Sequence, residues 1–226
     1  NAQTAYNFDY RFAKSPTPPN VTAVSGDGKV TLYWDSVAED SYDTFMEKIG
    51  DEPKDFEGYK IYRATDLEFN DALTITDGDG NPTFYEPYSL DGEVCQWDLD
   101  DGISGWHPVD LNGIHFYLGD DTGLRHSFID TDVVKGQTYY YAVVAYDFGG
   151  DENNNIIPSD SPMRLRINSL TGELDLGPNV VSVISVQPVA GYTEPESSVE
   201  IPLVFGQSNG SIQYEIIDPL AVNSNN

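Results

Sequence analysis

The chain contains a single cysteine, Cys95, so no disulfide bond can form within it. Lysine and arginine are scarce: 11 of them stand against 38 aspartates and glutamates, for a formal net charge of −27. Such an acidic surface repels the phosphates of nucleic acids and anionic lipids, so neither is an expected partner. No apolar run reaches the roughly 18 residues of a membrane-spanning helix, and membrane insertion is not expected.

One long segment has no cations at all. Between Arg63 and Arg125 lie fourteen Asp and Glu residues and no Lys or Arg. Two explanations for this acidity stay open and can coexist. The first is solubility, for example in a saline habitat, and the second is partial neutralisation by Ca²⁺, which prefers oxygen ligands. The chain also lacks an initiator methionine and a signal peptide, and we interpret it as a piece of a longer protein.

The abundant residues favour strands and turns. The chain has 15 Tyr, 10 Phe, 20 Gly and 14 Pro, and its apolar content of 39% is enough for a core. Residues 29–34 place Val30, Leu32 and Trp34 on one face, which is the alternation of a half-buried strand. Further strands are predicted at 58–63, 127–130 and 136–145. These patterns predict an all-β fold.

Three segments resemble strands B, C and F of a fibronectin type III domain. They read Gly28-Lys-Val-Thr-Leu-Tyr-Trp34, Gly58-Tyr-Lys-Ile-Tyr-Arg63 and Gly136-Gln-Thr-Tyr-Tyr-Tyr-Ala-Val-Val-Ala145. The resemblance implies an immunoglobulin-like β-sandwich in which Trp34 and Tyr59 lie inside and Tyr139 is the corner tyrosine. The other expected core positions on these strands are Ile61, Tyr141 and Val143. The style of the sequence also resembles modules of large secreted bacterial surface proteins.

The sequence predicts three units along the chain. Residues 1–17 form an N-terminal strand and a proline-rich linker, with aromatic side chains at alternate positions from Tyr6 to Phe12. Residues 18–170 form the fibronectin type III-like sandwich, with a long acidic insertion at 64–124. Residues 171–226 are expected to form a partial second β domain, which either is incomplete or packs on the first.

Acidic loops are the candidate metal sites. Asp77-Gly-Asp79-Gly-Asn81 places three oxygen-bearing side chains at alternate positions, which suits Ca²⁺, although Pro82 and Tyr88 exclude an EF-hand loop. The same residues are also a strong signal for a polar turn. The further metal candidates in the insertion are Asp98, Asp100 and Asp101. The alternative interpretation of each cluster is a solvated acidic surface.

Aromatic residues in the insertion allow two interpretations. If Trp97 and Trp106 are exposed, they form a surface on which a sugar ring can stack beside carboxylates. If they are buried, they belong to a small core of the insertion, which an insertion of this length needs in order to fold. An exposed coplanar pair of Trp97 and Trp106 would favour a glycan-binding protein.

The sequence gives no motif for catalysis. There is no His-x-x-x-His or Cys-x-x-Cys pair for zinc, no Gly-x-Ser-x-Gly and no phosphate-binding glycine loop. Cys95 is interpreted as a small buried residue. We therefore expect a non-enzymatic protein.

The expected role is that of an extracellular structural or adhesive module at the cell surface, stabilised by Ca²⁺, in a larger surface or filamentous assembly. Its expected partners are adjoining domains of the same polypeptide or neighbouring copies, because both ends of the chain have the character of joining segments. The alternative is a carbohydrate-binding accessory module of a secreted polysaccharide-degrading enzyme, with a glycan as its partner.

Overall fold

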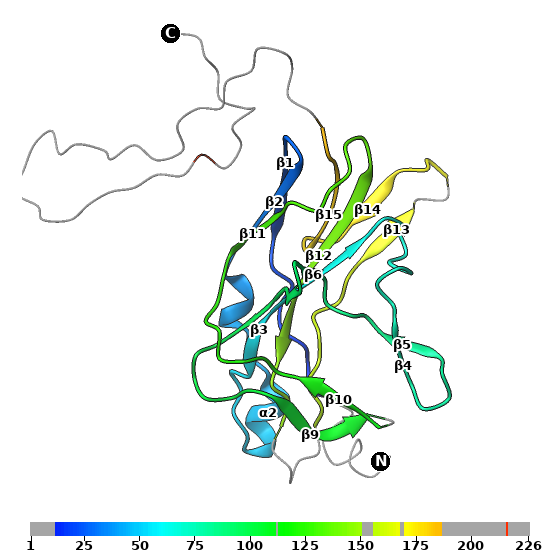
Figure 1. Ribbon diagram of the computed structural model, residues 1–226. Helices are drawn as coiled ribbons and strands as arrows, with labels where there is room; N and C mark the ends of the chain where they lie inside the picture. Colours follow the sequence, from blue (N-terminus) through cyan, green and yellow to red (C-terminus); the bar gives the residue numbers. More distant parts are fainter. Residues whose placement is uncertain (1–11, 112, 151–155, 168–169, 187–215, 217–226) are drawn as a thin grey trace, which may run out of the picture.

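The computed structural model describes residues 12–111, 113–150, 156–167, 170–186 and 216, and the regular secondary structure of this part of the chain is mostly antiparallel β-sheet (Figure 1). The expectation of a β-rich fold is confirmed. The strands are β1 (Val21–Gly26), β2 (Lys29–Trp34), β3 (Phe56–Ala64), β4 (Ile75–Thr76), β5 (Pro82–Phe84), β6 (Ser89–Leu90), β7 (Glu93–Val94), β8 (Gln96–Asp98), β9 (Trp106–Leu111), β10 (Ile114–Tyr117), β11 (Ser127–Asp130), β12 (Thr138–Asp147), β13 (Leu165–Ile167), β14 (Leu174–Leu176) and β15 (Val180–Ile184).

The first sheet has the order β1-β2-β11. Strand β2 has the alternation that the sequence predicts, with Val30, Leu32 and Trp34 buried and the residues between them half-buried. Gly28 at the β1–β2 turn has a φ of 67°, a backbone conformation that glycine adopts without the steric cost of a Cβ. The turn brings β1 and β2 into a register in which Val21 lies opposite Trp34.

The second sheet has the order β15-β12-β3-β8. Strand β15 pairs with β12 from Thr138 opposite Ile184 to Ala142 opposite Val180. The sequence assigned residues 180–184 to a second domain that begins at 171, and that boundary is wrong for this strand. The prediction failed because the β pattern after Gly172 gives no information about which sheet it joins.

The insertion also contributes to the second sheet. Strand β8 lies inside the predicted insertion at 64–124 and pairs with β3, with Gly58 opposite Asp98. The strands β4–β5, β6–β7 and β9–β10 form short two-stranded pairs around it. The insertion is therefore joined to the sheet by backbone hydrogen bonds and is not a separate lobe.

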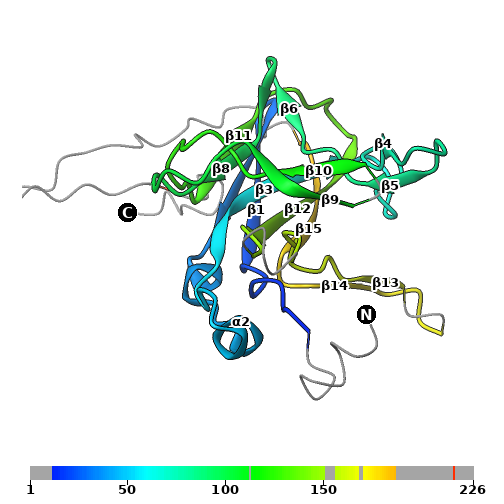
Figure 2. The same cartoon turned by 90° about the horizontal axis from the view of Figure 1, so that it is seen from below.

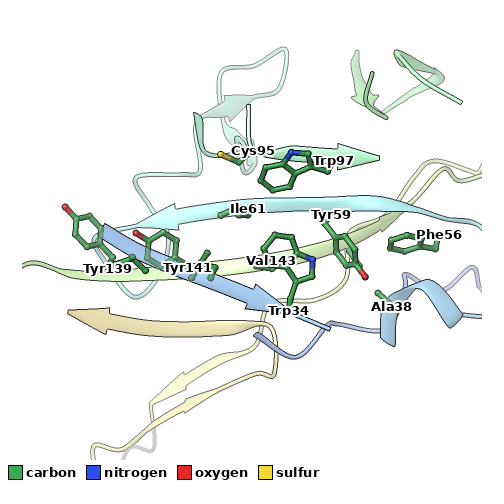
Figure 3. Close-up of a cluster of buried hydrophobic side chains, with 13 residues drawn as sticks. Trp34, Ala38, Phe56, Tyr59, Ile61, Cys95, Trp97, Tyr139, Tyr141 and Val143 are labelled. Atoms are coloured by element: carbon green, nitrogen blue, oxygen red, sulfur yellow. The ribbon is translucent and has the colours of Figure 1, made fainter. Parts of the chain in front are cut away.

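The main core lies between the two sheets (Figure 3). Trp34 from the first sheet packs edge-on against Tyr59 from the second, with ring centroids 5.8 Å apart. The remaining core positions that the sequence predicts also lie in this cluster: Ile61, Tyr139, Tyr141 and Val143.

A second apolar cluster covers the opposite face of the four-stranded sheet. Tyr62 and Val144 from this sheet are buried there beside Phe69 of the insertion and beneath the partly buried Leu165 and Leu176. Leu165–Ile167 pairs with Leu174–Leu176 in a separate hairpin. Because both faces of the sheet are covered, almost every residue of β3 is buried.

The polar segment that connects β2 to β3 along the chain contains the helices η1 (Val37–Asp40) and α2 (Thr44–Ile49). Helix α2 begins at Asp43, whose carboxylate accepts a hydrogen bond from the backbone N–H of Phe45 at 2.7 Å. It ends at Gly50 in the left-handed conformation. Figures 1 and 2 both place α2 on the side of the molecule opposite the β4–β5 and β13–β14 hairpins.

We predict that Trp34→Ala lowers the free energy of unfolding by ~3–5 kcal/mol, because it removes a large ring from the centre of the main core. Trp106→Ala is the matched control, since that ring is 69% exposed. The control is expected to change stability by well under ~1 kcal/mol. Urea unfolding followed by circular dichroism measures both variants. A Trp34→Ala protein as stable as the parent would contradict the packing of the two sheets.

Candidate functional site

The Asp77–Asn81 loop lies at the tip of the β4–β5 hairpin. Asp77 Oδ1 accepts hydrogen bonds at 2.9 Å from the backbone N–H groups of both Asp79 and Asn81. The Asn81 side-chain amide also donates to the Asp77 carboxylate, at 3.2 Å to Oδ2. These hydrogen bonds, first of all those from Asn81, lower the pKa of Asp77. The carboxylate that the sequence proposes as a Ca²⁺ ligand is thus directed back into its own turn, an arrangement typical of Asx turns.

The second group of predicted metal residues is divided between interior and surface. Asp98 is fully buried, while Asp100 and Asp101 are exposed. Asp98 accepts hydrogen bonds from the backbone N–H groups of Asp121 at 2.6 Å and Thr122 at 2.8 Å, and from the Thr122 hydroxyl at 2.8 Å. Asp98 therefore fixes the loop that follows β10 onto the edge of the four-stranded sheet.

Glu57 is a buried carboxylate that the sequence analysis did not single out. Its side chain is 0% exposed, and neither carboxylate oxygen has a hydrogen-bond partner among the described residues. It lies at an irregularity in the pairing of β3 with β12, between Phe56, which pairs with Asp147, and Gly58. Burial, and then the charges of Asp101, Asp98 and Asp121, raise the pKa of Glu57 to about 8. An acid between Phe56 and the strand predicted at 58–63 was the signal that could have identified it.

Two more acids are buried near the same end of β3 and β12. Burial, followed by the charge of Asp147, raises the pKa of Asp55 to about 7. Burial likewise raises the pKa of Asp147 to about 7, although its carboxylate accepts hydrogen bonds from the Ser159 hydroxyl at 2.6 Å and the Ser159 backbone N–H at 2.8 Å. Residues 151–155, which follow Asp147 in the chain, lie outside its described part.

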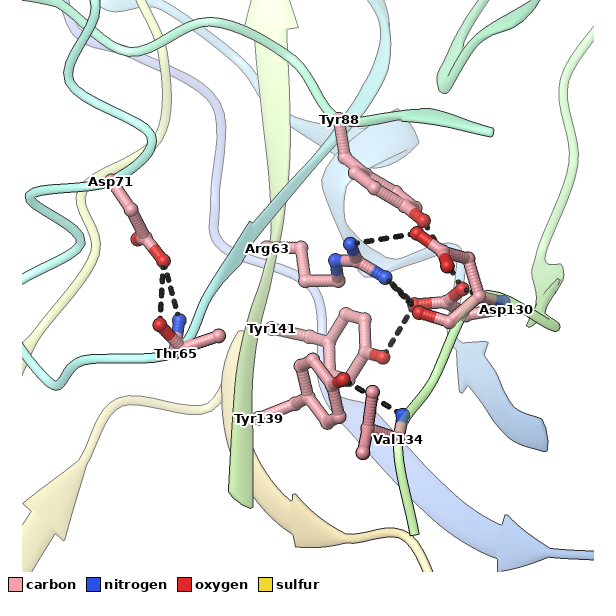
Figure 4. Close-up of polar contacts among 9 residues, drawn as sticks. Arg63, Thr65, Asp71, Tyr88, Asp130, Val134, Tyr139 and Tyr141 are labelled. Carbon is pink, nitrogen blue, oxygen red and sulfur yellow. Dashed lines mark hydrogen bonds and ion pairs between the residues drawn. The ribbon is translucent and has the colours of Figure 1, made fainter. Parts of the chain in front are cut away.

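The best-connected polar group is centred on Asp130 of β11 (Figure 4). Its buried carboxylate forms an ion pair with the Arg63 guanidinium of β3, with 2.8 Å between Nη1 and Oδ2. Tyr141 of β12 and Tyr88 of the insertion donate hydroxyl hydrogen bonds to it at 2.6 Å and 3.2 Å. Strand β11 belongs to the first sheet, whereas β3 and β12 belong to the second. This group therefore connects both sheets and the insertion.

Arg63 is held on more than one side. Its Nη1 donates to the backbone carbonyl of Asp132 at 2.7 Å, and Nη2 lies 3.2 Å from the Asp132 carboxylate. The guanidinium also lies 3.9 Å from the centroid of the Tyr88 ring. A cation over an aromatic face is stabilised by the ring quadrupole, which adds to the ion pair.

The two tryptophans proposed as a ligand-binding pair have different environments. Trp97 is 7% exposed and stacks on Trp34 with ring centroids 6.0 Å apart, so it is part of the main core. Of the two interpretations that the sequence allows for Trp97, burial is the one seen here, in the core between the sheets and not in a separate core of the insertion. The pairing of β8 with β3 turns the Trp97 ring inward. Trp106 is exposed and packs instead beside Tyr117, at 4.8 Å between centroids.

Trp106 borders a cavity of about 1050 Å³ whose lining includes residues of β3 and β8. Residues of the β9–β10 hairpin and of the segment from β4 to β7 also line it. Lys60 of β3 lies on the floor, 3.5 Å from the Asp160 carboxylate and 3.4 Å from the centroid of the Phe116 ring. Burial lowers the pKa of Lys60, while Asp160 acts in the opposite direction.

No group of three or more His, Cys, Asp or Glu side chains among the described residues is arranged to hold a metal ion as it stands. Cys95 is buried, and burial raises the pKa of its thiol to about 12. His107 is also buried, with Nε2 lying 3.1 Å from the backbone carbonyl of Gly150.

The chain has no match among protein-family models, curated proteins or solved structures. Among the residues that the structure describes, no helix has both the length and the apolar character to cross a membrane.

We predict that Asp130→Ala lowers the free energy of unfolding by ~3 kcal/mol or more, because it leaves Arg63 and two tyrosine hydroxyls without their shared acceptor. Asp132→Ala is the matched control. Its carboxylate pairs with the same arginine but is 74% exposed, so the expected loss is below ~1 kcal/mol. Urea unfolding separates the two cases. Equal losses for both variants would contradict the structural role of Asp130.

Proposed function

We propose that this chain is a non-enzymatic, extracellular structural or adhesive module of a larger surface or filamentous assembly, built on a fibronectin type III-like sandwich. The order of the strands supports this fold. Sheets β1-β2-β11 and β15-β12-β3-β8 have the order expected for strands A-B-E and G-F-C-C′ of such a sandwich. The hydroxyl of Tyr139 accepts a hydrogen bond from the backbone N–H of Val134 at 2.9 Å, as a corner tyrosine does.

The structural role is supported by three buried carboxylates, each of which holds another segment of the chain in place. Asp130 connects the two sheets, Asp98 holds the loop after β10, and Asp147 holds Ser159. Each of these carboxylates joins segments that are distant in the sequence. Buried polar groups with all their partners rigidify a fold and specify one arrangement. A stiff module that carries a large insertion is suited to transmitting contacts between neighbouring domains or copies.

Ca²⁺ is part of the proposal, and Glu57 is its best-supported ligand. A buried carboxylate without hydrogen-bond partners is costly, and a bound cation removes that cost. Asp98, Asp101 and Asp121 act on Glu57 through their charges. Of these, Asp101 is on the surface, and its Oδ1 accepts a hydrogen bond from the backbone N–H of Ile103. Backbone carbonyls and water would have to supply the rest of the six to eight oxygen ligands typical of Ca²⁺. The Asp77–Asn81 turn is the second candidate position.

We predict that Ca²⁺ raises the thermal stability of the chelator-treated protein. A ligand that binds the native state alone contributes about 2.7 kcal/mol at a hundredfold excess over Kd. Glu57→Gln keeps the shape of the side chain without its charge and is expected to lose most of the response. Glu173→Gln, an exposed acid between β13 and β14, is the control. Calorimetry with and without chelator measures each midpoint.

Two other outcomes would change the calcium proposal. If the response persists in Glu57→Gln but disappears in Asp79→Ala, the ion binds at the β4–β5 turn. If the midpoint of the parent protein does not move, the chain is not stabilised by Ca²⁺ at all.

We predict that residues 1–12 pair as a strand with a neighbouring copy or an adjoining module. Tyr6, Phe8 and Tyr10 lie outside the described residues, and Phe12 is 67% exposed. Hydrogen exchange followed by mass spectrometry is measured at low and high protein concentration, with a variant that lacks residues 1–14 as the control. Protection of residues 1–12 should rise with concentration in the full chain, and only the full chain should self-associate. Complete protection in the dilute monomer would show that the strand pairs within its own chain.

A further inference from the structure

The cavity beside β3 and β8 has the size and form of a ligand site. Its volume of about 1050 Å³ is at the upper end of the range for small-molecule sites in proteins. Backbone pairing fixes the floor, because β3 and β8 belong to the four-stranded sheet. The β9–β10 hairpin is joined to this floor by the hydrogen bond that Gln96 Nε2 donates to the backbone carbonyl of Tyr117, at 3.0 Å. The site is therefore held in shape by the fold itself.

Trp106 and Tyr117 give the cavity an exposed aromatic wall. They lie opposite each other on β9 and β10, and their rings are tilted by 57°. Trp106 keeps 69% of its surface exposed. The Tyr117 hydroxyl donates a hydrogen bond to the Asp120 carboxylate, which fixes its ring. Because the rings form a corner and not a flat surface, one ring of a ligand can stack on Trp106 while its edge meets Tyr117.

Negatively charged side chains outnumber positively charged ones around the cavity. The lining contains four carboxylates, Glu86, Glu93, Asp120 and Asp160, and two basic side chains, Lys60 and Arg125. Lys60 is already paired with Asp160 and lies against the Phe116 ring. The Arg125 guanidinium lies 5.5 Å from the centroid of the Trp97 ring. An anionic ligand would meet a surplus of negative charge here, on a chain whose net charge is −27.

We propose that this cavity binds a segment of an uncharged polysaccharide, with one sugar ring stacked on Trp106. The C–H groups on one face of a pyranose ring are apolar and slightly positive, and they match the negative face of an indole. Sugar hydroxyls are hydrogen-bond donors, and carboxylates such as Glu93 and Asp120 are their acceptors. The inference goes beyond the structural role proposed above, because it requires neither Ca²⁺ nor assembly.

A purely apolar ligand fits this chemistry less well. It would cover carboxylate oxygens at the rim without giving them donors, and the uncompensated desolvation of a polar group opposes binding. A proline-rich peptide can also lie in an aromatic groove, but its recognition depends on its rigid extended backbone and offers few donors to the carboxylates. The uncharged sugar uses both the aromatic wall and the acidic rim.

The test uses the full chain and a panel of soluble oligosaccharides of glucose, xylose, mannose and galactose. Trp34 and Trp97 are buried, so Trp106 is the exposed one of the three tryptophans and reports binding through its fluorescence and its protection from acrylamide. Calorimetry gives the affinity. At least one neutral sugar is expected to bind with a Kd of about 1 mM or tighter. Oligogalacturonate, which is anionic, is expected to bind at least about tenfold more weakly.

Variants locate the binding in the cavity. Trp106→Ala is expected to weaken binding at least about tenfold, and Trp106→Phe, which keeps a ring, to restore most of it. Tyr42→Ala removes an aromatic side chain that is 49% exposed and does not line the cavity, so it should leave binding unchanged. Circular dichroism confirms that the variants fold. Failure of every neutral sugar to bind, an equal affinity for oligogalacturonate or a proline-rich peptide, or binding that survives Trp106→Ala would each overturn the proposal.

Discussion

Strand β3 is buried on both faces, and its three charged side chains must each be compensated inside the protein. Arg63 is paired with Asp130 of the opposite sheet, and Lys60 is paired with Asp160 and packed on Phe116. Glu57 has no hydrogen-bond partner among the described residues. An uncompensated buried charge costs several kcal/mol, so each of these side chains requires another segment of the chain to lie in a defined place. The positions of β11, of the β9–β10 hairpin and of the segment around Asp160 follow from this requirement.

The insertion supplies much of the material that makes this burial possible. Its strand β8 extends the sheet, and its Phe69 fills the second apolar cluster. Its Tyr88 hydroxyl reaches Asp130, and its ring covers the Arg63 guanidinium. The insertion meets the cations of β3 with aromatic rings, since Phe116 lies against Lys60 and Tyr88 against Arg63. The carboxylates that pair with these two cations, Asp160, Asp130 and Asp132, lie outside the insertion.

The sequence predicted the features that a local residue pattern determines, such as the buried face of a strand. It missed the features that depend on which strands pair with each other. The alternation of Val30, Leu32 and Trp34 and the burial of Tyr139 follow from a period of two along a strand. The pairing of β15 with β12 and of β8 with β3 joins residues that are distant in the sequence, and no local signal encodes it. The environment of Trp97 depends on that pairing, so the sequence alone left its ring open between the surface and a core of the insertion. The cavity was missed for the same reason, because its walls come from separate segments.

Glu57 is a buried carboxylate that has no hydrogen-bond partner among the described residues. A carboxylate in a buried position can be neutralised in two ways, by taking up a proton or by binding a cation. Uptake of a proton is favoured near neutral pH, because burial raises the pKa of Glu57 to about 8 and its protonated form then predominates over the charged form. The proposed Ca²⁺ is the second way, and it would replace the proton with an ion that also attracts Asp101. Protonation removes the buried charge of Glu57 and affects β3 alone. An ion bound by both Glu57 and Asp101 would also draw the insertion onto the sheet. Calcium would therefore stiffen the module at the point where the insertion meets the sandwich, which a proton cannot do.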